Sequence, residues 1–194
     1  MAFNRTLNGV RHRTSAQDRF YTPPCVVNTC VKMVTDFVNK NIENDVADMI
    51  WFEPFKGAGA FYNQFPCHQE NKRWTEIDLG RNFLEFNEEV DIICTNPPFS
   101  ILNEVFEKIV KLDAPIVLLL IGVMNLTKNR YHIMEDAGYK IVKIHFCDIK
   151  GWFGINQCVM WVKDELLDED YDPPITHSGR NLIKKPDGSA YTHV

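Results

Sequence analysis

A continuous apolar run from Ile116 to Gly122 places the tightest limit on how this chain can fold. The run follows Pro115, has the length of a β-strand and contains no polar side chain. A strand of this composition is buried on both faces, which is typical of the centre of a parallel sheet covered by helices. No apolar run reaches the roughly 20 residues that span a membrane. The sequence therefore predicts an α/β fold without a membrane-spanning segment.

Helical and strand patterns alternate along the rest of the chain. Apolar residues recur at helical spacing over residues 24–41, where Pro23 and Pro24 suit a first turn, and from Ser100, a capping residue, to about Leu112. A third helix is predicted over residues 128–137, and short strands over residues 49–52, 74–77, 90–95, 116–122, 141–146 and 157–162. We therefore expect a mainly parallel sheet with helices on both faces. The last two strands have no helix between them, which predicts an antiparallel strand at that edge.

The length of 194 residues favours one folded domain, which we place over residues 18–163. A flexible polar segment, residues 1–17, is expected before it, and a polar extension, residues 164–194, after it. The six cysteines lack a Cys-x-x-Cys spacing, so we expect reduced thiols and no metal site. The N-terminus has no apolar secretory segment, which also favours a cytoplasmic protein.

The net charge of −5 argues against a general binder of polyanions. It does not exclude nucleic acid, because the basic residues are unevenly placed. They gather in residues 5–13, 72–73, 128–130 and 180–185. The first group is the best candidate for a phosphate contact, although solvated surface charge is the simpler explanation for any single group.

Two acidic residues at predicted strand ends indicate a ligand-binding edge. Glu53 directly follows the first strand, and Gly57 and Gly59 allow the backbone to turn sharply and approach a ligand. A dinucleotide fingerprint would need a third glycine that is missing here, and the leading acid indicates a ligand with an amino group instead. Glu76, in the stretch Glu76-Ile77-Asp78, can accept hydrogen bonds from ribose hydroxyls. A solvent-facing acid explains Glu76 equally well.

The most specific string is Asn96-Pro97-Pro98-Phe99, which directly follows an apolar strand. Two successive prolines fix the backbone and remove two N–H donors, which leaves carbonyl groups to accept hydrogen bonds. Asn96 adds a side-chain carbonyl, and Phe99 adds an aromatic face. Acceptors fixed beside an aromatic ring suit a planar group that carries an NH2.

Together with Phe20-Tyr21-Thr22-Pro23-Pro24, these segments resemble the N6-adenine DNA methyltransferases. Asn96–Phe99 is similar to catalytic motif IV, Glu53–Phe61 to motif I and Phe20–Pro24 to motif X, in the gamma-type order X, I, IV. The resemblance runs from about Asp18 to Lys163, and it is closest to short, single-domain members found in phages, other viruses and mobile elements. It implies a Rossmann-like methyltransferase fold, a catalytic domain over residues 18–163, and a place in the cytoplasm of a bacterial or infected host cell.

The resemblance also implies S-adenosylmethionine as the cofactor. Motif I would hold its methionine part, with Glu53 near the ammonium group. Thr22 would contact its carboxylate, although by itself Thr22 is explained as a helix cap. Glu76 would bind the ribose, and either Asn82 or Asp78 would contact the adenine ring, where the family often has an Asp-Phe pair. The implied cofactor-binding residues are Tyr21, Thr22, Pro23, Glu53, Pro54, Phe55, Gly57, Gly59, Glu76, Asp78, Asn82 and Phe83.

For catalysis, the resemblance implies an adenine flipped out of a duplex, or taken from a single strand, and held against Phe99. Asn96 Oδ1 and the Pro97 carbonyl would accept hydrogen bonds from the exocyclic NH2 and so direct the nitrogen lone pair toward the methyl group. No strong general base is required, because the proton can leave after transfer. The implied catalytic residues are Asn96, Pro97, Pro98 and Phe99.

Three alternatives share these residues. Enzymes that methylate glutamine side chains have a similar string, usually ending in Tyr, together with an extra N-terminal helical domain. RNA adenine methylation uses identical chemistry, and a non-catalytic nucleic-acid-binding partner could keep the fold. We expect nucleic acid as the partner, DNA before RNA, and a monomer or homodimer. Roughly thirty polar residues follow the last strand, too few for a separate recognition domain. This predicts relaxed sequence preference or a specificity-giving protein partner.

Overall fold

The computed structural model describes residues 21–152 and 154–173. Within them, six strands form one sheet in the order β2-β1-β3-β4-β6-β5. Strands β1 to β4 are parallel, whereas β6 runs antiparallel to both of its neighbours, β4 and β5. The strand bounds are β1 (Trp51–Glu53), β2 (Lys72–Trp74), β3 (Ile92–Thr95), β4 (Ile116–Gly122), β5 (Tyr139–Cys147) and β6 (Asn156–Lys163). The predicted mainly parallel sheet, closed by an antiparallel pair at one edge, is confirmed; β5 is the outer strand of that pair.

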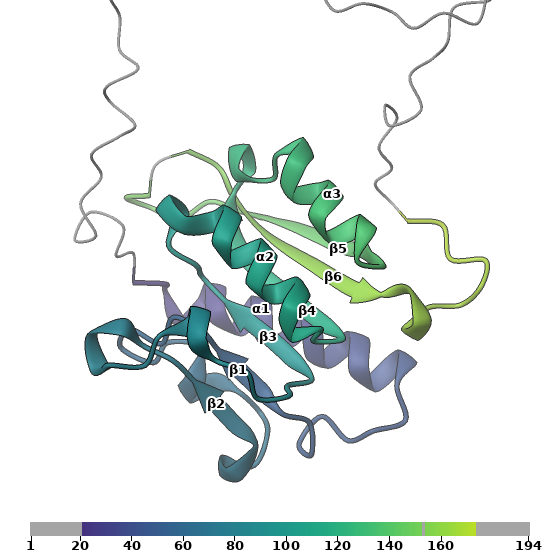
Figure 1. Cartoon of the computed structure of the whole chain (residues 1–194), viewed down its shortest axis with the longest axis horizontal. Coiled ribbons are helices and arrows are strands. Elements are labelled where there is room, and N and C mark those ends of the chain that lie inside the picture. Colours follow the sequence, from purple (N-terminus) through teal and green to yellow (C-terminus); the bar gives the residue numbers. More distant parts are fainter. Residues whose placement is uncertain (1–20, 153, 174–194) are drawn as a thin grey trace, which may run out of the picture.

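Helices cover both faces of the sheet, as predicted. Helix α1 (Pro24–Asn41) lies behind the sheet in Figure 1, and α2 (Leu102–Leu112) and α3 (Lys128–Asp136) lie in front of it. Side chains alternate between the two faces along each strand, because successive Cβ atoms of a strand point to opposite sides. Trp51 therefore packs in the core under α1, and its neighbour Phe52 packs in the core under α2.

The central strand is β4, whose residues 116–121 are all buried. Leu118 and Leu120 face the α1 side of the sheet, whereas Val117 and Leu119 face the α2 side. Burial on both faces explains why the sequence needs an unbroken apolar run at this place. The predicted position of this strand is confirmed.

Two local predictions are wrong. The second strand covers residues 72–74 and not 74–77, since Ile77 lies in a 3-10 turn, η4 (Ile77–Leu79). The partner strand β1 is only three residues long and is followed by Pro54, and the regular pairing of β2 with it ends at Trp74. The second helix also starts later than Ser100: a 3-10 turn, η6 (Phe99–Ile101), comes first, and Ile101 occupies the N-cap position of α2.

Helix α1 has the predicted bounds, but Thr22 is not its capping residue. Pro23 occupies the N-cap position, and no side chain caps the helix. Of the other predicted segments, residues 1–17, Phe20 and residues 174–194 lie outside the described part of the chain. None of the helices in the described part has the length and apolar content to cross a membrane.

Candidate active site

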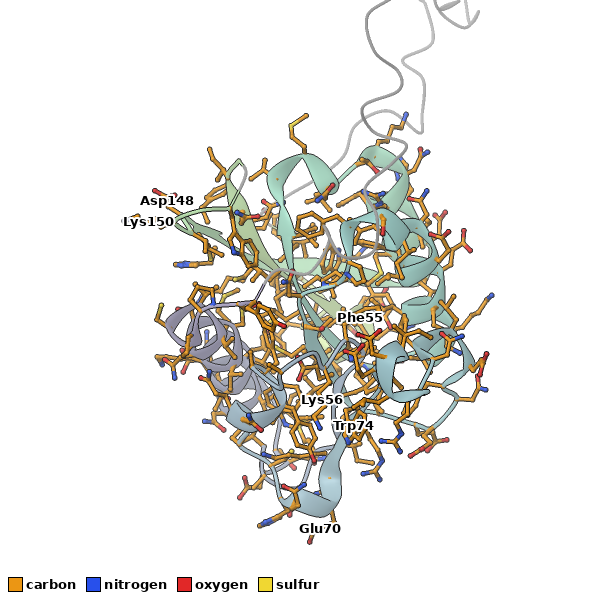
Figure 2. The ribbon with its side chains drawn as sticks, turned by 90° about the vertical axis from the view of Figure 1, so that its left-hand side faces the viewer. Phe55, Lys56, Glu70, Trp74, Asp148 and Lys150 are labelled. Atoms are coloured by element: carbon orange, nitrogen blue, oxygen red, sulfur yellow. The ribbon has the colours of Figure 1, made fainter. Side chains whose placement is uncertain are left out.

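The carboxyl ends of β1, β2, β3 and β4 meet at one edge of the sheet, because the four strands are parallel and adjacent. Figure 2 looks onto this edge and labels Phe55 and Lys56, which follow β1, and Trp74, the last residue of β2. Ligands of open α/β sheets bind outside this edge. The segments singled out in the sequence after β1, β2 and β3 are therefore brought together by the topology.

Glu53, the last residue of β1, carries a buried carboxyl group. The residue is 2% exposed, and its Oε2 accepts a hydrogen bond from the Tyr62 amide at 2.6 Å. Burial raises the pKa of Glu53 to about 8, a shift that the amide hydrogen bonds and the nearby Lys56 ammonium only partly offset. A positively charged ligand group beside this carboxyl would restore its ionised form.

The turn after Glu53 depends on two glycines. Gly57 and Gly59 have φ values of +49° and +83°, in the left-handed region that other residues rarely adopt. The Gly59 amide closes the turn on the Lys56 carbonyl at 2.7 Å. Apart from Gly57 and its two neighbours in the chain, no heavy atom of the described residues lies within 4 Å of the place where a Cβ on Gly57 would stand. The backbone at Gly57 is thus open to an approaching ligand.

Glu76 joins this turn to the end of β2. Its Oε2 accepts a hydrogen bond from the Gly57 amide at 2.7 Å, and its Oε1 accepts one from the Asp78 amide at 3.3 Å. Thr75 adds two further links, because its amide donates to the Glu53 carbonyl at 3.1 Å and its hydroxyl to the Pro54 carbonyl at 2.5 Å. The segments after β1 and β2 therefore form one braced unit. A carboxylate has about four acceptor positions, so Glu76 retains capacity for a ligand hydroxyl.

A cluster of cations and aromatic rings, absent from the sequence predictions, supports the same turn. Lys56 Nζ lies 4.0 Å from the centre of the Trp74 ring and 4.7 Å from that of Tyr62. The Arg81 guanidinium also lies 4.1 Å from the Trp74 ring. Such cation–π contacts favour a fixed arrangement of the loop. No local pattern in the sequence signals them, because strand pairing brings Lys56 and Trp74 together.

Phe83 and Asn82 have structural contacts next to this unit. Phe83 is buried and packs edge-on against Phe55, with ring centres 5.1 Å apart. The Asn82 side chain accepts a hydrogen bond from the Leu84 amide at 3.0 Å and donates one to Glu85 at 3.0 Å. Asn82 thus caps a 3-10 turn, η5 (Phe83–Glu85). Of the two residues proposed for the cofactor adenine, Asn82 is engaged in this cap.

Asn96 follows β3 and contacts the segment before α1. Its Nδ2 donates a hydrogen bond to the Thr22 hydroxyl at 3.3 Å, across 74 residues of sequence. Thr22 itself is buried, whereas its neighbour Tyr21 is 72% exposed. Because the amide nitrogen faces Thr22, the carbonyl oxygen of the same group points elsewhere. The fold thus joins the two segments that the resemblance identifies as motifs X and IV.

The rest of the string is held between β3 and the turn η6. Pro97 is buried, and Phe99 is partly buried and packs against the core on the α2 side. The Pro98 carbonyl accepts a hydrogen bond from the Ile101 amide at 3.4 Å. The backbone on both sides of Asn96 is consequently fixed.

Asn156 is a further polar residue at this edge that the sequence reasoning missed. It is the first residue of β6, is 1% exposed, and pairs with Gly122 at the end of β4. Its Oδ1 lies 3.9 Å from the place where a Cβ on Gly122 would stand. The strand registers put Asn156 on the same face of the sheet as Asn96. The antiparallel direction of β6 brings its first residue, and not its last, to this edge.

Solved structures of other proteins share this architecture. Magnesium protoporphyrin IX methyltransferase from Synechocystis PCC 6803 with bound SAM matches with a TM-score of 0.56 at 10% identity, over 72% of this chain and 79% of that chain. Its structure with bound SAH matches with a TM-score of 0.53 at 8% identity, over 72% and 82%. This chain therefore has a methyltransferase fold. At such identities the likeness establishes the fold alone, and it confirms the predicted Rossmann-like methyltransferase architecture. No family model matches the chain, and no curated protein matches its sequence.

Proposed function

We propose that this chain is an S-adenosylmethionine-dependent methyltransferase that modifies the exocyclic N6 of adenine in DNA. One observation carries the proposal. Asn96, fixed by Thr22, lies at the same sheet edge as the buried carboxyl of Glu53 and the open glycine turn. This arrangement supports a cofactor subsite at the end of β1 and a subsite for an amino group at the end of the adjacent strand β3.

The residues at the end of β1 fit the amino-acid part of S-adenosylmethionine. Glu53 would hold its ammonium group, since a cation relieves the cost of ionising a buried carboxyl. Gly57 would allow close backbone approach, and Glu76 would accept hydrogen bonds from the ribose. Thr22 remains our candidate for the carboxylate contact. When bound, the cofactor supplies an electrophilic methyl group on a sulfonium.

The residues after β3 would hold the methyl acceptor. Asn96 Oδ1 and the Pro97 carbonyl would accept hydrogen bonds from the NH2 of adenine, and the Phe99 ring would contact the base. These bonds orient the nitrogen lone pair without removing a proton beforehand. The chain contributes to the reaction by positioning the amino group and by electrostatics. The Thr22 contact and the turn η6 keep the Asn96–Phe99 segment in place.

The preference for adenine in DNA rests on the resemblance of Asn96–Phe99 and of the motif order to the N6-adenine DNA methyltransferases. Tritiated methyl transfer to DNA, RNA and protein, run in parallel and followed by mass spectrometry of the labelled product, tests it. We expect N6-methyladenine in DNA. Label found only in RNA adenine, or only in glutamine side chains, would replace the proposed substrate.

A further inference from the structure

Three large apolar side chains stand in solvent at the carboxyl edge of the sheet, outside the site described above. Met124 is 88% exposed, Ile155 65% and Phe146 64%. They come from three separate segments: the 3-10 turn η7 (Val123–Asn125) after β4, the residue before β6, and the end of β5. Large apolar groups gathered on a surface usually mark a contact with another molecule.

Hydrogen bonds and strand register make these residues one surface, which we call the apolar rim. The Val123 amide, next to Met124, donates to the Ile155 carbonyl at 2.9 Å. Phe146 pairs across the β5–β6 register with Gln157, two positions after Ile155. The apolar rim borders the candidate active site, because β4, which leads into Met124, is the sheet neighbour of β3, which leads into Asn96.

The turn that carries Met124 is braced. The Arg130 guanidinium donates to the Asn125 carbonyl at 2.8 Å and to Asn103 Oδ1 at 3.0 Å, which ties the turn to α2. The Thr127 hydroxyl caps α3 directly afterwards. These hydrogen bonds fix the turn, and the fixed turn keeps Met124 exposed to solvent.

Two lysines lie close in sequence to residues of the apolar rim. Lys128, the first residue of α3, and Lys150, in the segment after β5, are both exposed, with Asp148 as a nearby acid. Figure 2 shows Asp148 and Lys150 on the outer margin of the edge, on the side of α1. Exposed apolar side chains together with exposed lysines complement a partner with stacked bases and a phosphate backbone.

We propose that the apolar rim docks duplex DNA. Met124 and Ile155 contact the base step next to the nucleotide that is withdrawn, and Lys128 and Lys150 contact phosphates. Extruding a base breaks stacking on both of its neighbours, and apolar side chains inserted at that step replace the lost contacts. This inference rests on the proposed function, because it assumes that a base leaves the duplex for the Asn96 subsite.

The test compares duplex and single-stranded oligonucleotides of the same sequence. For the double variant Met124→Ala/Ile155→Ala we expect kcat/KM to fall about tenfold on the duplex and less than about twofold on the single strand. Leu84→Ala, which removes another exposed apolar side chain, is the control and should change neither. Equal losses on both substrates, or no loss, would overturn the proposal.

Equilibrium binding separates this inference from the proposed function. Anisotropy with a labelled duplex should show weaker binding by the double variant. Lys128→Ala and Lys150→Ala should each reduce the slope of log K against log salt concentration by about 1. If the native chain transfers no methyl group but these binding changes occur, the proposed function fails and the docking surface stands. If binding is unchanged while the double variant shifts a dimer to a monomer in sedimentation, the rim contacts a second copy and the proposal is wrong.

Discussion

Replacing Glu53 by glutamine should make the protein more stable and unable to bind its cofactor. Glu53 is 2% exposed, and the pKa of its carboxyl group is raised from 4.5 to about 8. In the unfolded chain the group ionises above its ordinary pKa, whereas in the folded chain it stays protonated until about pH 8. The contribution of Glu53 to stability is therefore fully present below pH 4.5, falls as the pH rises, and is lost once the pH passes the folded pKa.

The size of the effect follows from the shift. Each pH unit between the two pKa values costs about 1.4 kcal/mol, so the penalty is about 3 kcal/mol at pH 7 and approaches about 5 kcal/mol at pH 9. Glu53→Gln carries no such penalty, and its amide oxygen can still accept the Tyr62 hydrogen bond. At about 2–4 °C per kcal/mol for a chain of this size, the variant should melt roughly 6–12 °C higher at pH 7.

Thermal unfolding from pH 5 to pH 9, followed by circular dichroism, measures this effect. The melting temperature of Glu53→Gln should exceed that of the native chain by an amount that grows with pH. The control Glu107→Gln changes an exposed glutamate on α2 and should melt at the native temperature. S-adenosylmethionine at 100 times its Kd should stabilise the native chain by about 2.7 kcal/mol but leave Glu53→Gln unchanged. A difference in melting temperature that does not vary with pH, or a variant less stable at every pH, would show that Glu53 is not held protonated by burial.

Three further substitutions test the two subsites, and two of them have a matched control. Asn96→Ala should lower kcat about 10²–10³-fold and leave the Kd for the cofactor, measured by calorimetry, within about twofold. The control Asn28→Ala lies on the exposed side of α1 and should change neither value. Gly59→Ala and Gly138→Ala each place a Cβ at positive φ and 3.2 Å from a side-chain atom. Each should therefore lower the free energy of unfolding in urea by about 1–2 kcal/mol. Only Gly59→Ala should also weaken cofactor binding. Thr22→Val removes the acceptor for the Asn96 amide and should lower kcat about tenfold without unfolding the chain; an unchanged kcat would show that the contact is dispensable.

The parts of the fold that could be predicted are those in which local sequence decides the structure. Helix α1 has the expected bounds because apolar residues at helical spacing and an initial proline act within one segment. The bounds of strand β4 could also be predicted, since burial on both faces requires an unbroken apolar run. The predicted position of β2 is wrong, because a strand of three residues is too short to show an alternation of apolar and polar side chains. Its position is set by pairing with β1.

The same distinction holds for the candidate site. Asn96 and Glu53 could be selected from the sequence because unusual residue types stand at the ends of apolar strands. The contact of Asn96 with Thr22 and the burial of Asn156 could not be, since both depend on which strands are neighbours and in which direction they run. Gly57 and Gly59 were correctly assigned to a turn, but the bond from Gly57 to Glu76 appears only when β1 and β2 are paired.

The activity that we propose is methyl transfer to the N6 of adenine in DNA at the Asn96 subsite. It is tested most directly by nucleoside mass spectrometry of DNA from a methylation-free host that expresses either the native chain or Asn96→Ala. We expect N6-methyladenine with the native chain and at least a hundredfold less with the variant. Equal N6-methyladenine from both proteins, or none from a native chain that is folded and binds S-adenosylmethionine, would contradict it.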